Sequence, residues 1–176
     1  AAFAMFLLAR PRVVSLRASP PFGWALGLGI GSMQASYLIY RLFDEQLQYS
    51  EYSGINAVSV TMAFTIALVS CLGHALPTSW QGARILESSR RRPFIISAVA
   101  RGALTMCLVL ALFMPLMMLL TVPVIALAWG PAQNSWLPSG MTPAAKQAFR
   151  RTTRQSQRLK RASEERIRGQ ALDSEE

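Results

Sequence analysis

The sequence predicts an all-α fold: a small helical membrane protein with about three transmembrane helices, or four, and a basic C-terminal helix. Of its 176 residues, 52% are hydrophobic and only 15% are charged, whereas a soluble domain carries about 25% charged residues. The charged residues also cluster in short connections and in the tail instead of being spread along the chain. A bilayer environment accounts for both features.

Three parts follow from this clustering. Residues 1–21 form a basic N-terminal arm, residues 22–130 form a transmembrane helical domain, and residues 131–176 form a polar, basic C-terminal tail. The arm holds three arginines and no acidic residue. That composition is typical of an organellar targeting region or its remnant, and equally of a basic helix on a membrane surface.

The first two predicted spans lie near residues 22–43 and 55–76. Each is 22 residues long, and about 20 helical residues cross the ~30 Å of hydrocarbon in a bilayer. Trp24 lies near one end of the first span and tyrosines lie near the other, as expected for aromatic belts at the two interfaces. Pro77 is expected to end the second span.

The third apolar region, residues 93–129, is longer than one crossing needs. One interpretation is a single tilted span near residues 102–127. The other is two shorter spans that break near Pro115, where the ring removes a backbone hydrogen bond. The positive-inside rule favours four crossings, which return the tail to the side of the other basic segments. The length favours three, and three is our prediction.

The tail begins with a helix start signal, Thr142 as the cap and Pro143 at the first helical position. Gly169 is the expected end of this helix. Its apolar residues are too sparse to form a stripe that faces a core, so we expect it to be mostly in contact with water or headgroups.

Glycine recurs at every fourth position of the first span, so one helix face is formed by Gly23, Gly27, Gly31 and Ala35. In lipid, helices gain no hydrophobic free energy by associating, and small residues instead allow two backbones to come close enough for dispersion and Cα–H···O contacts. The pattern therefore predicts a helix-packing face.

Two partners for this face stay open. The second span offers a matching row of small residues: Ala63, Ala67 and Cys71. Gly29 widens the face of the first span, so a helix of another subunit is the alternative.

The loop between the second and third spans is predicted to bind anionic lipid, with cardiolipin as the natural candidate, or the acidic surface of a partner. Its arginines are Arg84, Arg90, Arg91 and Arg92, opposed by a single glutamate. Arg101 belongs to the same predicted set. It snorkels to the interface if the third span starts near residue 102, and it lies deeper if the region is split.

His74 is the only histidine in the sequence. An imidazole at the end of the second span could ligate haem iron, with the second axial ligand supplied by a partner chain. The alternative is an interfacial histidine that caps the helix end. No other cofactor or metal site is expected.

Two stretches resemble the mitochondrial inner-membrane protein-translocase family. "GWALGLGIGS" looks like the first span of that family, and "GARILESSRRRPFIISAVARGAL" is similar to its basic loop and third span. The resemblance covers roughly residues 23–104 and extends to a relative that is an accessory subunit of respiratory complex I. Arg92-Pro93 stands where the family has a proline or an Asp-Pro pair, and the third span lacks the family's run of glycines. These departures favour a scaffold over a channel.

The sequence holds no intramembrane acid, phosphate-binding loop or Ser/His/Asp set, so we expect no enzyme, no nucleic-acid partner and no small-molecule substrate. The expected function is that of a non-catalytic accessory subunit in an energy-transducing membrane complex, such as a mitochondrial respiratory complex. Its partners would be other membrane subunits and anionic lipid. The alternatives are a haem- or quinone-associated anchor of an oxidoreductase and a protein-translocase component. The thylakoid membrane fits the same composition as the mitochondrial inner membrane.

Overall fold

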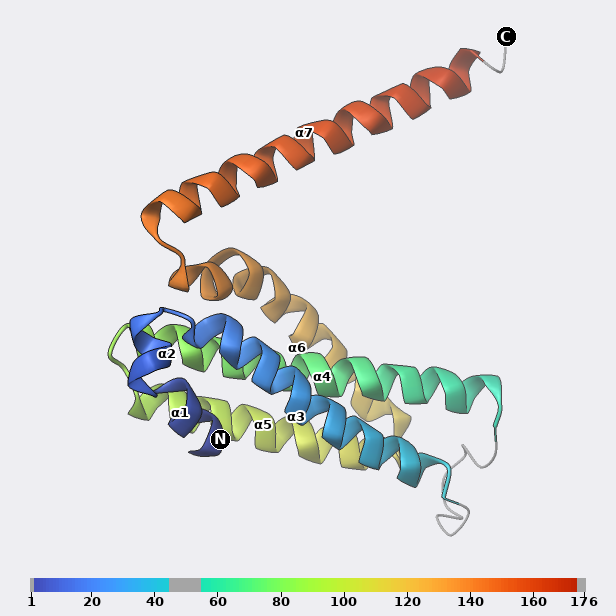
Figure 1. Ribbon diagram of the computed structural model, residues 1–176. Helices are drawn as coiled ribbons and strands as arrows, with labels where there is room; N and C mark the ends of the chain where they lie inside the picture. The colour runs from blue at the N-terminus through green and yellow to red at the C-terminus, as the bar shows by residue number, and fades with distance from the viewer. Residues whose placement is uncertain (1, 45–54, 174–176) are drawn as a thin grey trace. The chain divides into compact units, whose positions relative to one another are not determined.

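The computed structural model describes residues 2–44 and 55–173, with side chains as far as residue 168. It divides into two compact units, Ala1–Gly140 and Met141–Glu176, which we call the bundle unit and the tail unit and describe separately. The described residues form helices and no strand (Figure 1), so the all-α prediction is confirmed. Glu45 and Glu51, which belong to the predicted acidic loop, lie outside the described residues.

The bundle unit consists of two short helices followed by four long helical stretches that alternate in direction (Figure 1). A 3-10 turn, Pro115–Met117, precedes the last helix, and a π-helical turn and a second 3-10 turn, η3 (Leu137–Gly140), follow it. The helices are α1 (Ala2–Leu8), α2 (Pro11–Ser15), α3 (Ser19–Leu42), α4 (Ala57–Leu86), α5 (Arg91–Ala111) and α6 (Met118–Pro131).

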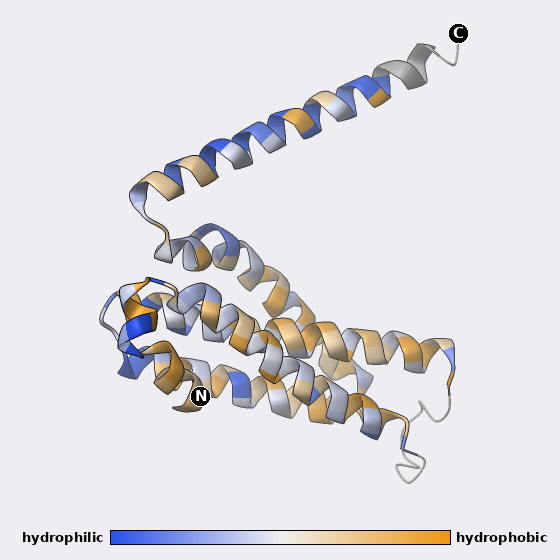
Figure 2. Cartoon of the chain, viewed as in Figure 1, coloured by the Kyte–Doolittle hydropathy of each residue, from blue (hydrophilic) through white to orange (hydrophobic). Residues whose placement is uncertain are grey.

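Three stretches of the described chain are long and apolar enough to cross a membrane: Ala57–Leu86, Arg91–Ala111 and Pro115–Gly140. The prediction of a small helical membrane protein with about three such helices is therefore confirmed. The set of spans differs from the prediction, because α3 is not among the three. Its glycines, serines and one glutamine lower its hydropathy, although it lies in the same bundle. Figure 2 shows the apolar residues along these helices.

The predicted single span over residues 102–127 is wrong. α5 ends at Ala111 and α6 begins at Met118. Between them Met114 has an extended backbone, with φ −133° and ψ 93°, and Pro115 starts the turn. Proline has no N–H to donate and its ring blocks the preceding helical turn, so the chain reverses here. The interpretation with a break near Pro115 describes the structure.

The predicted end of the second span at Pro77 is also wrong. α4 is 30 residues long, and it continues past this proline to Leu86. The helix is anchored at its start by a capping box in which Asn56 and Ser59 each accept a backbone N–H of the other. Prolines are tolerated inside membrane helices where neighbouring groups satisfy the disturbed backbone. The Ser97 hydroxyl of α5 donates to the Pro77 carbonyl over 3.2 Å and so connects the two helices at this point, although the carbonyl that loses its helical donor is that of Gly73.

One apolar cluster connects the four long helical stretches at the end of the bundle near the α5–α6 turn. Its buried residues come from α3 to α6, and Leu112 belongs to the turn. They are Leu38, Leu42, Met62, Ile66, Val69, Leu104, Leu108, Ala111, Leu112 and Met118. This cluster is the hydrophobic core of the bundle unit.

The N-terminal arm is folded onto the bundle. α1 packs on α3 and α4, with Ala4 and Leu8 buried. The Ser19 hydroxyl at the start of α3 donates to the Leu8 carbonyl over 3.1 Å. Whether the arm is also a targeting region stays a prediction.

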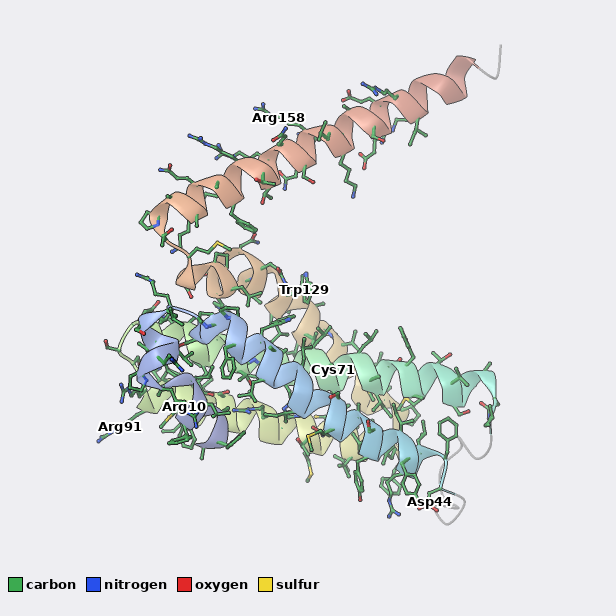
Figure 3. All side chains as sticks on the ribbon, viewed as in Figure 1. Arg10, Asp44, Cys71, Arg91, Trp129 and Arg158 are labelled. Carbon is green, nitrogen blue, oxygen red and sulfur yellow. The ribbon has the colours of Figure 1, made fainter. Side chains whose placement is uncertain are left out.

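Charge differs between the two ends of the bundle. Arg10 and Arg91 lie at one end and Asp44 lies at the other (Figure 3). Gly140, the last residue of the bundle unit, packs against the backbone carbonyl of Arg17. The break at Pro115 therefore returns the chain to the arginine-rich end of the bundle. Three alternating helices would instead have left the chain at the opposite end, where Asp44 lies.

The tail unit contains α7 (Pro143–Asp173). Thr142 accepts the backbone N–H of Ala145 over 3.3 Å, which matches the predicted cap. The predicted stop at Gly169 is wrong, because the helix runs on to Asp173. The tail also starts later than the predicted residue 131, since the unit boundary follows Gly140.

Candidate functional site

The glycine row of α3, Gly23, Gly27 and Gly31, lies directly against the backbone of α4. A Cβ atom built on Gly23 would lie 2.5 Å from the carbonyl oxygen of Thr78, and one on Gly31 would lie 2.5 Å from that of Ser70. A Cβ on Gly27 would overlap the backbone of residues 74–75. Real Cβ atoms do not approach backbone this closely, so only glycine permits this contact.

The α4 residues that face the glycine row also recur every fourth position. They are Ser70, His74, Thr78 and Gly82, and Gly82 packs against the backbone of Ser19. The Ser70 hydroxyl donates to the Gly31 carbonyl over 2.8 Å. The two helices are antiparallel, and each turn of α3 in the glycine row contacts one turn of α4. The packing face predicted from the glycines is therefore filled by a helix of the same chain.

The partner row predicted on the second span differs from the observed one. Cys71 lies beside Gly31, but Ala63 packs on the apolar cluster and Ala67 is half-buried. The contact instead extends past Pro77 to Gly82. Because the second span was expected to stop at Pro77, the part of α4 beyond it was missing from the predicted contact. Gly82, a further small residue in the same spacing of four, could have indicated this part of the contact. Ala35 continues the α3 face and is only 4% exposed.

The opposite face of α3 is open. No described atom lies within 4 Å of a Cβ built on Gly29. Ser32 donates its hydroxyl to the Gly29 carbonyl over 2.8 Å, and Ser36 donates to the Ser32 carbonyl over 2.9 Å. Both hydroxyls are therefore satisfied by the helix itself. Met33, one turn after Gly29, is 77% exposed on the same face. Tyr40, on the same side, is 72% exposed.

His74 lies inside the bundle and does not cap a helix end, so the predicted interfacial position is wrong. α4 continues past it, its side chain is buried, and its Nε2 atom hydrogen-bonds the Gln34 side-chain oxygen. The Nδ1 atom is buried with no partner among the described residues. Haem ligation through Nε2 would require the bond to Gln34 to break. No cluster of three or more metal-ligating residues occurs in the described ranges.

Arg101 is separate from the basic loop, and the predicted snorkelling position at the start of a span does not apply. It lies within α5, because this helix begins at Arg91. The side chain is buried between helices, where it donates to the Gln81 side chain and to the Ser97 carbonyl, both over 3.4 Å. Within the part of the chain that the structure describes, no carboxylate pairs with it.

The basic loop connects α4 with α5 at the arginine-rich end of the bundle. The four arginines of the predicted loop are all exposed; Arg84 lies in the last turn of α4, Arg90 in the connection, and Arg91 and Arg92 in the first turn of α5. Arg84 pairs with Glu87 over 2.6 Å and lies 5.8 Å above the ring of Trp80. An open pocket of about 240 Å³ lies between Arg84 and Arg92. Figure 3 shows Arg91 at this end of α5.

A comparison of the chain with protein-family models, curated proteins and solved structures finds no match. The resemblance to the translocase family therefore stays a prediction. What the geometry establishes is an all-α membrane protein whose first long helix has one small-residue face filled and another open.

Proposed function

We propose that the chain is a non-catalytic, structural subunit of a larger membrane complex. The observation that supports this is the pair of small-residue faces on α3. One face is filled by α4 of the same chain, and the opposite face, with Gly29, Ser32 and Ser36, is open.

The open face suits a helix better than it suits lipid. The small residues Gly29, Ser32 and Ser36 form a shallow strip beside the exposed side chains of Met33 and Tyr40. A second helix approaches the backbone closely along this strip and gains dispersion contacts, whereas acyl chains gain little from it. α3 is not among the three stretches that are long and apolar enough to cross a membrane, so cover by protein on both faces stabilises it in a bilayer. We therefore place a transmembrane helix of another subunit on this face.

We further propose the mitochondrial inner membrane as the location and a respiratory complex as the assembly. The arginine-rich arm without acidic residues and the resemblance to an accessory subunit of respiratory complex I support this choice. The exposed basic residues of α7 supply a surface for acidic partner loops.

The decisive variant is Gly29→Leu. A Cβ atom here meets no described atom beyond its own stretch of helix, and leucine is a better helix former than glycine by about 0.8 kcal/mol. The isolated chain should therefore fold, while the leucine side chain keeps the partner helix away. We expect loss of co-migration with the larger assembly after mild detergent extraction, with unchanged helicity.

Gly130→Leu is the matched control, because Gly130 is also open within 4 Å but lies on α6. It should leave co-migration intact. If Gly29→Leu co-migrates as well as the Gly130→Leu control does, the open face of α3 does not dock a subunit and the proposal fails.

A further inference from the structure

We propose that the bundle unit binds one anionic phospholipid at its basic end, with the phosphate between Arg84 and Arg92 and one acyl chain between α4, α5 and α6. Each half of this site is a separate cavity lined by this chain alone. The inference therefore does not depend on the proposed assembly.

The headgroup half is the pocket of about 240 Å³ at the α4–α5 connection. Arg84 and Arg92 line it, together with Glu87. Glu87 offsets the charge of Arg84, but Arg92 has no carboxylate within 4.0 Å among the residues that the structure describes. The ring of Trp80 beneath Arg84 holds that guanidinium over the pocket. The pocket thus retains a net positive charge for an anion.

The acyl half is a cavity of about 450 Å³ between α4, α5 and α6. Small residues, including Gly73, Ala100 and Ala103, leave its volume open. The hydroxyl of Thr121, which also lines it, donates to the Met118 carbonyl over 3.1 Å and so offers no free donor. The lining is otherwise almost wholly hydrocarbon and aromatic, and it suits an alkyl chain rather than a polar ligand.

The two cavities adjoin. Trp80 and Ile96 line both of them, so the arginine pocket lies at one end of the apolar cavity. Tryptophan at this level is typical of a membrane interface, and Trp24 and Trp129 form an edge-to-face pair 5.7 Å apart in the same unit. A charged pocket directly above a hydrocarbon cavity matches an amphiphile. A free anion would use only the first cavity, and a neutral lipid only the second.

The test uses the full chain, purified in mild detergent and depleted of lipid, with phosphatidylglycerol added back and bound lipid counted by native mass spectrometry. We expect one tightly bound lipid. Arg92→Gln should weaken its binding about fivefold, the factor for one arginine beside an anionic headgroup. Ala103→Phe, which fills the cavity, should weaken it by at least as much. Glu87→Gln should strengthen it, because this removes the competing carboxylate.

Two matched controls and two ligand controls accompany these variants. Arg154→Gln removes an exposed arginine from α7, and Ala25→Phe adds a ring to an exposed position of α3; neither should change lipid affinity. Phosphatidylcholine should bind far more weakly, and millimolar inorganic phosphate should not compete. Equal binding of phosphatidylcholine, competition by phosphate alone, or normal binding by Ala103→Phe would each overturn the proposal.

Discussion

Alanine substitutions of the glycines distinguish the filled face of α3 from the open one. A Cβ on Gly31 would lie 2.5 Å from the Ser70 carbonyl oxygen, whereas a Cβ on Gly29 meets no described atom. Both changes give the same gain in helix propensity, about 0.8–1 kcal/mol, so this gain cancels between the two variants. What remains is the steric conflict at Gly31, typically about 1–3 kcal/mol. To this is added the weakened Ser70–Gly31 hydrogen bond, about 0.6 kcal/mol in membrane helices.

The free energy of unfolding of Gly31→Ala should therefore be about 1.6–3.6 kcal/mol below that of Gly29→Ala. Gly73→Ala is the intermediate case, because its Cβ would meet the tips of the Leu104 side chain at 2.5 and 2.8 Å. A side chain can rotate away where backbone cannot, so we expect a smaller loss than at Gly31.

The measurement is denaturant unfolding of the full chain in detergent micelles, followed by far-ultraviolet circular dichroism. Each variant is compared at the same protein and detergent concentrations. Equal stability of Gly31→Ala and Gly29→Ala would refute the close contact between α3 and α4. A loss of stability at Gly73 larger than that at Gly31 would show that overlap with the α4 backbone is not the main cost of a side chain at Gly31.

Two further predictions concern polar groups inside the bundle. Arg101→Leu should raise the free energy of unfolding by about 1 kcal/mol. An arginine costs about 2.5–3.5 kcal/mol within a membrane span, and the long hydrogen bonds of Arg101 offset only part of this cost. A loss of stability in the same unfolding assay would contradict the prediction. Ser70→Ala should lower the free energy of unfolding by about 0.6–1 kcal/mol, because it removes the donor to the Gly31 carbonyl. Ser36→Ala is its control, since Ser36 bonds only within α3; an equal loss in both would show that the contact between helices contributes nothing.

The sequence was sufficient to predict the helical membrane fold and the glycine face, because both follow from local patterns. Spacing of four places Gly23, Gly27 and Gly31 on one side of any helix. The cap at Thr142 could be predicted for the same reason.

The positions of the helix ends could not be predicted, because they depend on contacts between helices. Proline ends most helices, yet α4 continues through Pro77, where it contacts α3 at Thr78 and α5 at Ser97. Pro115 is preceded by an apolar run that would suit a longer helix, yet the chain turns there and α6 packs back on α4 and α5. Both prolines look alike in the sequence, and only tertiary packing decides which of them breaks a helix.

The pairing of His74 with Gln34 could not be predicted either. The two residues are 40 positions apart, and neither lies in a motif that identifies the other. Their contact follows from the alignment of α3 with α4, which is set by the whole length of the glycine row.

That alignment has a consequence for how uniquely the two helices are paired. Glycine or alanine recurs at every fourth position of α3, and the facing row of α4 consists of small or polar residues. Sliding α3 by one turn, about 5.4 Å, would again bring glycines opposite such neighbours. Van der Waals fit alone would leave such neighbouring alignments close in energy. The hydrogen bond between the side chains of His74 and Gln34 is satisfied in one alignment only. The Ser70 hydroxyl donates to a backbone carbonyl, and after a shift of one turn it would face the next carbonyl along α3. The small-residue surface therefore supplies the attraction between α3 and α4, and the pairing of His74 with Gln34 selects which of the neighbouring alignments forms.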